Sequence, residues 1–181
     1  KNFLPEQYER TGTLPINHNY LMQQFSDYEK IFEKLKQVVI KGDFTLGSAV
    51  DLLENQFKET VNTQYAIGVG SGTDALFLSL KALNLKEGDE VITTPFTFYA
   101  TIGAIVTAGG TPVFSDILDD YNINPAEITS KITSKTKAIL PVHWAGKPCH
   151  MDAINAIAKQ HGLFVIEDAC QNVVTCVEDP I

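Results

Sequence analysis

Residues 65–76 read Tyr65-Ala66-Ile67-Gly68-Val69-Gly70-Ser71-Gly72-Thr73-Asp74-Ala75-Leu76, and the prediction of the fold begins with them. The apolar first half of this stretch predicts a strand over residues 65–69, and its second half opens a helix pattern over residues 73–83. The glycines between them let the backbone close around an anion without Cβ clashes. A helix start also presents unpartnered N–H groups and a partial positive charge. The stretch therefore predicts a strand, a phosphate-binding turn and a helix in succession.

The rest of the chain continues this alternation of short apolar runs and helix-length segments. We expect further strands over residues 90–94, 112–115, 137–143 and 163–167, and helices over residues 98–108, 125–132 and 151–160. Such alternation predicts an α/β fold: a mostly parallel sheet covered by helices on both faces, in three αβα layers. No internal repeat interrupts it.

Two amphipathic helices are expected before this region. One covers residues 26–40 and ends at Gly42, and the other begins at Gly47-Ser48. Residues 1–24 show no steady period and are expected to form an irregular arm. The predicted organisation is thus an arm with helices over residues 1–64 and the sheet domain over residues 65–181.

The amino-acid composition favours some classes of protein and argues against others. The chain has 181 residues, of which 44% are hydrophobic, and this favours a globular domain with its own core. A net charge of −8 argues against nucleic acid or an anionic membrane as partners. Apolar runs are too short to span a bilayer, so we expect a cytoplasmic protein. Three cysteines without a CxxC pair indicate neither a disulfide framework nor a zinc site.

Chemically useful residues follow the expected strands. Ligands of open parallel sheets bind at the carboxyl ends of the strands. At those ends the sequence places the glycine turn 70–73, the aromatic run Pro95-Phe96-Thr97-Phe98-Tyr99, the pair His143-Trp144, and Asp168 with Gln171 close behind. Each aromatic could belong to the core, and His143 could be a hydrogen-bonded structural histidine. A carboxylate such as Asp168 at the end of a buried strand requires a cation or a donor beside it.

Two cofactor classes compete for this edge. A dinucleotide fits poorly, because Thr73 occupies the third glycine position of the fingerprint and the strand ending Thr93-Thr94-Pro95 carries no acidic residue for the ribose. Pyridoxal phosphate (PLP) needs a helix N-terminus for its phosphate, an aromatic face for its ring and a carboxylate for its pyridinium nitrogen. All three are present. A serine hydrolase is disfavoured, since no Gly-x-Ser-x-Gly elbow frames Ser71.

The chain also resembles the DegT/StrS family, PLP-dependent aminotransferases that act on nucleotide-linked keto sugars. The matching blocks are Gly42-Asp43-Phe44-Thr45-Leu46-Gly47, Ser71-Gly72-Thr73-Asp74-Ala75-Leu76, Gly88-Asp89-Glu90-Val91-Ile92, Thr97-Phe98-Tyr99-Ala100-Thr101, Gly110-Thr111-Pro112-Val113-Phe114, Val142-His143, Met151-Asp152-Ala153-Ile154 and Ile166-Glu167-Asp168-Ala169-Cys170-Gln171. The resemblance implies the large domain of the aspartate-aminotransferase fold (fold type I), a homodimer, and transfer of an amino group, commonly from glutamate, to a sugar ketone.

The resemblance also implies roles for particular residues. Gly72, Thr73 and Asp74 would hold the cofactor phosphate at the helix start, through backbone amides and the Thr73 hydroxyl. Phe98 would stack on the pyridine ring. Asp168 would bind the ring nitrogen and serve as the catalytic carboxylate, and Gln171 would lie near the phenolic oxygen.

The sequence departs from the family after Gln171. The run that follows lacks the family's glycines, and no lysine occurs after Lys159, so the Schiff-base lysine is not in this chain. Lys147 and Lys159 are expected in a loop and on an exposed helix face. We therefore expect a fragment without the small C-terminal domain that is inactive alone. Two alternatives stay open: a dehydratase relative in which histidine replaces the lysine, and a non-catalytic remnant that acts as a binding module.

Overall fold

The computed structural model describes residues 21–172. Most of the expected arm over residues 1–24, and the divergent run after Asn172, lie outside the described residues. The chain divides into two units at the Leu52/Leu53 boundary, which falls inside a helix. Each unit is described by itself.

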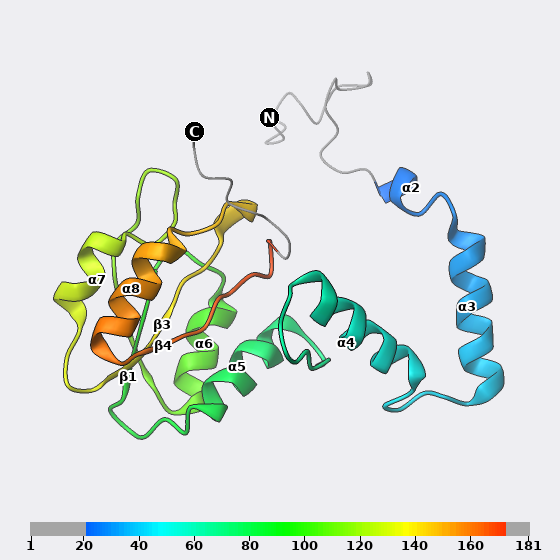
Figure 1. Ribbon diagram of the computed structural model, residues 1–181, viewed down its shortest axis with the longest axis horizontal. Coiled ribbons are helices and arrows are strands. Elements are labelled where there is room, and N and C mark those ends of the chain that lie inside the picture. The colour runs from blue at the N-terminus through cyan, green and yellow to red at the C-terminus, as the bar shows by residue number, and fades with distance from the viewer. Residues whose placement is uncertain (1–20, 173–181) are drawn as a thin grey trace, which may run out of the picture. The chain divides into compact units, whose positions relative to one another are not determined.

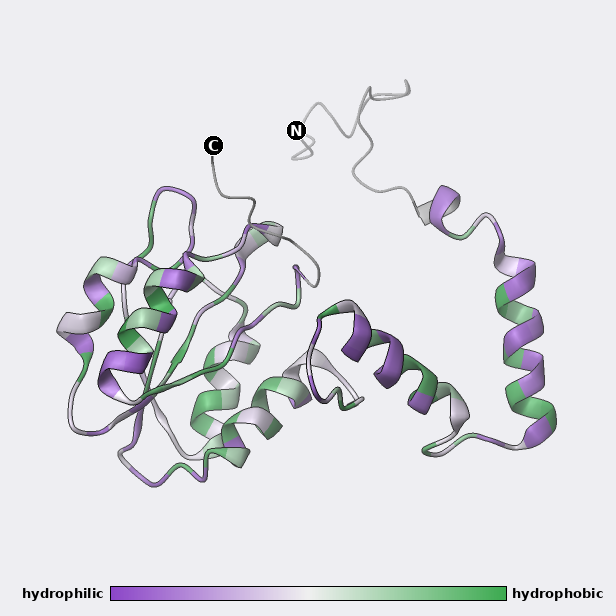
Figure 2. Ribbon diagram, viewed as in Figure 1, coloured by the Kyte–Doolittle hydropathy of each residue, from purple (hydrophilic) through white to green (hydrophobic). Residues whose placement is uncertain are grey.

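The first unit is helical. It contains α2 (Leu21–Gln24), α3 (Tyr28–Lys41) and the beginning of α4 (Ser48–Thr60). The expected helix over 26–40 is confirmed in α3, which ends at Gly42 in the left-handed region with φ 67°. Hydrophobic and hydrophilic residues alternate along α3 (Figure 2).

The start of α4 is fixed by Asp43. The Oδ2 atom of Asp43 accepts hydrogen bonds from Ser48 N at 3.0 Å and from Ser48 Oγ at 2.8 Å. These two bonds hold the pKa of Asp43 below its ordinary value. The sequence Asp43 to Ser48 thus supplies its own helix start, as the Gly47-Ser48 signal predicted.

The second unit contains the predicted alternation of strands and helices. Its elements are α5 (Gly72–Ala82), β1 (Glu90–Thr93), α6 (Tyr99–Ala108), β2 (Thr111–Phe114), α7 (Pro125–Lys131), β3 (Thr136–Leu140), the 3-10 turn η1 (Trp144–Gly146), α8 (Met151–His161) and β4 (Phe164–Val165). The alternation is confirmed, although the last two strands are shorter than expected because their final residues continue as extended backbone.

All four strands are parallel and lie in the order β2-β1-β3-β4. Ile92 of β1 lies opposite Val113 of β2 and Ile139 of β3. A single parallel bridge between Val142 and Asp168 extends the β3–β4 pairing beyond the strands themselves. Parallel pairing brings the carboxyl ends of all four strands to one edge of the sheet.

Helices cover both faces of the sheet, with α5 and α6 on one side and α7 and α8 on the other (Figure 1). The first core is built from buried residues of α5, α6, β1 and β3, namely Leu76, Leu80, Val91, Ala104, Ile105, Ala108, Ala138, Leu140 and Val142. The second contains Ile92, Ile123, Ile128, Ile139, Cys149, Ile154 and Ala158. Neighbouring strand residues such as Val91 and Ile92 serve opposite cores, as the pleat requires. The predicted three-layer αβα fold is confirmed.

The expected strand over residues 65–69 is wrong for this structure. The segment belongs to no strand, and Tyr65 and Ile67 are 79% and 80% exposed. A strand needs a neighbour for its backbone groups, and no strand within residues 21–172 pairs with this segment. Gly68 N instead donates to Glu54 Oε1 at 2.7 Å. The apolar pattern of residues 65–69 indicated a local preference for strand, but it did not indicate which strand would pair with this segment.

Candidate functional site

A cavity of about 290 Å³ opens at the carboxyl edge of the sheet. It lies among the starts of α5 and α6 and the segments that follow β3 and β4. The structure brings five of the six predicted cofactor residues into its lining: Gly72, Thr73, Phe98, Asp168 and Gln171. The sixth, Asp74, is not among the lining residues.

Asp168 is the buried carboxylate of this cavity, with 6% of the residue exposed. Its backbone pairs with the segment that directly follows β3. Asp168 N donates to Pro141 O at 2.9 Å, and His143 N donates to Asp168 O at 3.1 Å. Its Oδ2 atom accepts a hydrogen bond from Thr101 Oγ1 at 2.9 Å. The donor that a buried carboxylate requires is therefore a threonine of α6.

The start of α5 has an ordered cap. Ser71 Oγ accepts from Asp74 N at 3.1 Å, so one amide of the first turn is already paired. The Asp74 carboxylate turns back over Gly70, where a Cβ would lie 2.8 Å from Asp74 Oδ2. A Cβ on Gly72 would lie 2.9 Å from Cys170 Sγ, so glycine allows the close approach of α5 to the segment after β4.

The aromatic residues after β1 are not part of the core. Phe96, Phe98 and Tyr99 are 38%, 62% and 73% exposed, so the alternative interpretation of these residues as core is wrong. The Phe98 ring contacts Tyr99, with ring centroids 4.4 Å apart, and faces the cavity from the N-cap of α6. Phe96 packs instead against Tyr121 and Trp144.

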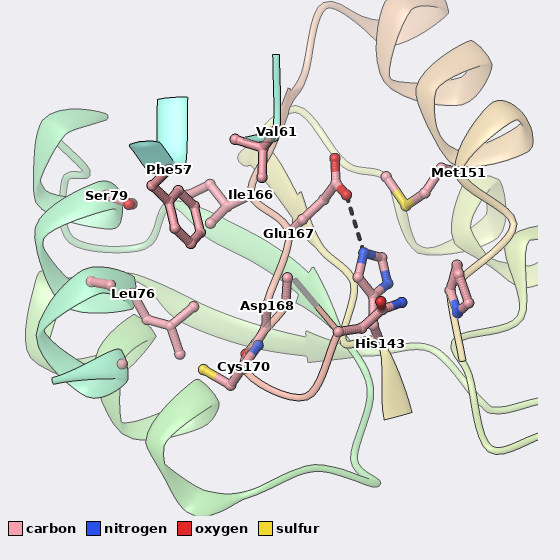
Figure 3. A pocket seen from close by; sticks show the side chains of 15 residues that line it. Phe57, Val61, Leu76, Ser79, His143, Met151, Ile166, Glu167, Asp168 and Cys170 are labelled. Carbon is pink, nitrogen blue, oxygen red and sulfur yellow. Dashed lines mark hydrogen bonds and ion pairs between the residues drawn. The ribbon is translucent and has the colours of Figure 1, made fainter. Parts of the chain in front are cut away.

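His143 is a hydrogen-bonded histidine, which agrees with its interpretation from the sequence as a structural residue. The residue is buried, its Nδ1 accepts from Cys149 N at 3.2 Å, and its Nε2 lies 3.1 Å from Glu167 Oε2 (dashed line in Figure 3). Since the backbone amide can only donate, Nδ1 is unprotonated and Nε2 carries the hydrogen toward Glu167. Both ring nitrogens are therefore engaged within the protein.

Gln171 closes the cavity from the loop after β4. Its Oε1 atom accepts from Ala145 N at 2.6 Å, in the turn η1 where Ala145 adopts a left-handed conformation with φ 52°. This bond leaves the amide NH₂ as the group with which Gln171 can donate to a ligand.

Sequence reasoning missed Thr97 and Thr101 as site residues. They lie four positions apart around the first turn of α6 and both line the cavity. The available signal was a pair of hydroxyls near Phe98, one directly before the N-cap and one in the first turn of α6. Their meaning depends on Asp168, 67 positions beyond Thr101, and no local pattern reveals that contact.

Cys170 lies beside this carboxylate. Partial burial of the thiol, together with the neighbouring Asp168 carboxylate, raises the pKa of Cys170 to about 11. A larger hollow of about 630 Å³ adjoins the same segment and shares Asp168 and Cys170 with the smaller cavity (Figure 3). Its lining includes the apolar side chains of Phe57, Val61 and Ile166.

Residues 21–172 offer neither a lysine in the cavity, nor a metal site, nor a membrane-spanning helix. No lysine lines the 290 Å³ cavity, and Lys147 instead pairs with Asp120 at 2.8 Å. These residues hold no group of three His, Cys, Asp or Glu side chains able to bind a metal ion. Each helix in this part of the chain is too short or too polar to cross a membrane.

Comparison with known proteins identifies the family. Residues 26–179 match the DegT/DnrJ/EryC1/StrS aminotransferase family, and this match covers most of the chain. The chain belongs to that family.

Relatives in the DegT family include enzymes with named sugar substrates. The dTDP-3-amino-3,6-dideoxy-α-D-galactopyranose transaminase of Aneurinibacillus thermoaerophilus is 44% identical over 146 residues, which are 80% of this chain and 40% of that protein. The chain spans between 36% and 42% of the length of five curated relatives that it matches.

Solved structures of the DegT family share the fold. NtdA of Bacillus subtilis, solved with bound cofactor PMP, is 40% identical with a TM-score of 0.79, over 81% of this chain and 34% of that one. A GDP-4-keto-6-deoxymannose-3-dehydratase, solved with a trapped PLP-glutamate adduct, is 32% identical with a TM-score of 0.73, over 78% of this chain and 38% of that one. The sheet is thus part of the large domain of fold-type I PLP aminotransferases.

Proposed function

We propose that residues 65–181 belong to the PLP-binding domain of an aminotransferase that moves an amino group, from glutamate, onto a nucleotide-linked keto sugar. One observation carries the proposal. The buried Asp168 carboxylate faces the same cavity as the exposed Phe98 ring and the start of α5. A carboxylate, an aromatic face and a helix N-terminus are the three groups that the cofactor's ring nitrogen, ring and phosphate require.

The residues of the cavity fit this cofactor. Asp74 N already donates to Ser71 Oγ, so we propose that the phosphate takes its donors from Gly72, Thr73 and the Thr73 hydroxyl, while Asp74 helps to cap the helix. Phe98 would lie against one face of the ring. The amide NH₂ of Gln171 would donate to the phenolic oxygen.

The cofactor, when bound, supplies an electron sink for the bonds around the amino carbon. The residues of this chain would keep the cofactor ring protonated and oriented so that it can accept electrons. Asp168, fixed at both its backbone and its side chain, would hold a proton on the ring nitrogen. The cavity walls would keep the ring in one orientation and exclude water from it.

The substrate class comes from the relatives. Two of them are named for dTDP-linked and UDP-linked amino sugars. We propose a substrate of the same class and a homodimer. The resemblance also implies a lysine that binds the cofactor covalently. Lys147 is paired with Asp120 and Lys159 lies on the exposed side of α8, so we assign that role to neither.

A transamination assay tests the proposal. The whole protein, meaning the longer protein to which we propose this chain belongs and which would supply the lysine, would be given PLP, glutamate and a panel of nucleotide-linked keto sugars. Formation of 2-oxoglutarate would be measured. We expect turnover with at least one sugar, and a loss of roughly 100-fold or more in Asp168→Asn, which removes a charge-assisted bond needed in the transition state. The control is Asp116→Asn, an exposed carboxylate just after β2 and outside the cavity lining. Equal turnover in the two variants would refute the role of Asp168.

Sugar dehydration is a second candidate function, favoured by the 32% identity to a dehydratase of the same family. The same assay separates the two. Release of water from the sugar without transfer of nitrogen to it indicates a dehydratase, and an aminated sugar product indicates an aminotransferase. A protein that binds PLP and does neither would support a binding module.

A further inference from the structure

Two threonines connect the start of α6 to the buried carboxylate. Thr97 Oγ1 lies 2.8 Å from Thr101 Oγ1, and Thr101 Oγ1 lies 2.9 Å from Asp168 Oδ2. Thr101 is fully buried and Thr97 is half-buried. All three residues line the cavity proposed for the cofactor.

The direction of the hydrogen bonds in this chain follows from the chemistry of its end. An ionised carboxylate can only accept, and a hydroxyl has one hydrogen to donate. Thr101 therefore donates to Asp168, and its oxygen must accept from Thr97. The result is a one-way chain, Thr97 to Thr101 to Asp168, in which each bond polarises the next.

The hydrogen bonds from Thr97 to Thr101 and from Thr101 to Asp168 fix the orientation of the Asp168 carboxylate, which its backbone hydrogen bonds do not. Hydrogen bonds with Pro141 and His143 fix the main chain of Asp168, but they leave rotation of its carboxylate free. Thr101 stops that rotation by holding Oδ2. The other oxygen, Oδ1, accepts a longer hydrogen bond of 3.4 Å from Cys170 N. The Cys170 thiol also forms a hydrogen bond with the Asp168 carboxylate.

We propose that Thr97 and Thr101 are positioning residues that hold Oδ2 of Asp168 so that Oδ1 meets the pyridinium nitrogen of the cofactor. The proposal rests on the proposed function, because it requires PLP or PMP in the 290 Å³ cavity. The same turn of α6 also carries Phe98. One helix start would therefore set both the plane of the ring and the direction of its nitrogen's partner.

The test uses PMP, whose amine forms no covalent bond to lysine, so that binding reports these contacts alone. Thr101→Val keeps the shape of the side chain and removes the donor, whereas Thr101→Ser keeps the donor. Binding of PMP to the whole protein would be measured by calorimetry. We expect about a tenfold loss of affinity in Thr101→Val, because hydrogen bonds to charged groups are among the strong ones, and a change within about twofold in Thr101→Ser.

A second ligand separates positioning from simple packing. A deaza analogue of PMP, with C–H in place of the ring nitrogen, lacks the group that Asp168 would bind. If Thr101 acts through that nitrogen, Thr101→Val weakens PMP binding but changes binding of the analogue by less than about twofold. Thr97→Val, which leaves the Thr101 donor in place, should show a smaller loss of the same kind and serves if Thr101→Val does not fold.

Each outcome decides the proposal. Equal losses for PMP and the analogue, no loss in Thr101→Val, or a loss in Thr101→Ser as large as in Thr101→Val would overturn it. If the unaltered protein binds no PMP, or if Asp168→Asn binds it equally well, the proposed function itself fails. If Asp168→Asn weakens PMP binding and Thr101→Val does not, only the positioning role is lost.

Discussion

At the residue scale, Phe98 combines high exposure with a place in a cavity. Phe98 is 62% exposed at the N-cap of α6, whereas Ala104 and Ile105 of the same helix are buried in the core. Exposure of a large aromatic ring is costly in water, and a flat ligand would cover it. This combination separates Phe98 from the exposed aromatics outside the cavity.

Phe98→Ala should therefore weaken cofactor binding without harming the fold. We expect a loss of PMP affinity of roughly 3- to 10-fold, the usual worth of an aromatic stacking contact, with little change in thermal unfolding. The control is Phe114→Ala on β2, since Phe114 is also exposed but lies outside the cavity lining. An unchanged PMP affinity in Phe98→Ala would remove the residue from the site.

Cys170 gives a second test at this scale. A shift of its pKa from 9.0 to about 11 lowers its thiolate fraction near neutral pH by roughly 100-fold. Iodoacetamide should accordingly label Cys170 far more slowly than a cysteine in a short peptide, and PMP should slow the labelling further because Cys170 lines the cavity. Peptide mass spectrometry measures both rates. Labelling as fast as in the peptide, or unaffected by PMP, would contradict this environment.

At the element scale, α6 joins the site to the core. Its first turn carries Phe98 and Thr101, while its later residues pack on the sheet. Gly103 lies on the opposite, exposed side, and a Cβ there would meet no atom within 4 Å. Glycine in the middle of a helix is destabilising by about 0.5–1 kcal/mol relative to alanine.

Gly103→Ala should stabilise the protein. The expected gain of about 0.5–1 kcal/mol corresponds to a rise in Tm of roughly 1–4 °C for a chain of this size. Gly109→Ala is the contrasting variant: Gly109 ends the same helix with φ 100°, so alanine there should lower Tm. Differential scanning calorimetry compares the two. A lower Tm for Gly103→Ala would mean that another part of the protein covers this side of α6.

An ion pair joins the loop between β2 and α7 to the segment that follows η1. The Nζ atom of Lys147 lies 2.8 Å from Asp120 Oδ2, and this bond holds the pKa of Asp120 below its ordinary value of 3.8. The unfolded chain then binds a proton more readily than the folded one. The stabilisation is therefore present above about pH 4 and is lost as the pH falls through the lowered pKa.

Asp120→Asn should remove this part of the acid sensitivity. Urea unfolding at low salt would be compared near neutral pH and well below pH 4, with the exposed neighbour Asp119→Asn as control. We expect the variant to lose less stability on acidification than the unaltered protein does. Because Lys147 is largely exposed, the effect should shrink at high salt. An identical pH response in the two proteins would show that the pair contributes nothing to stability.

At the scale of the whole molecule, local sequence patterns were sufficient to predict the αβα layers. They were insufficient to predict which segments pair with each other. The strand and helix periodicities predicted the three-layer αβα fold, because the apolar face of each element follows from the spacing of its own hydrophobic residues. The segment over 65–69 failed, since a strand also needs a partner that its own sequence does not name. The same limit applies to Thr101, whose contact with Asp168 is 67 positions away in the sequence. Phe98 and Asp168 could be placed together from the sequence because they follow parallel strands whose carboxyl ends lie at one edge of the sheet.

Under the proposed function, the carboxyl edge of the sheet would hold a pyridoxal cofactor between α5, Phe98 and Asp168. A crystal structure of the whole protein with PMP tests it most directly. We predict the phosphate at the start of α5, the ring against Phe98, and the ring nitrogen about 2.7–2.9 Å from a carboxylate oxygen of Asp168. A PMP molecule bound elsewhere, or one whose ring nitrogen turns away from Asp168, would contradict the account.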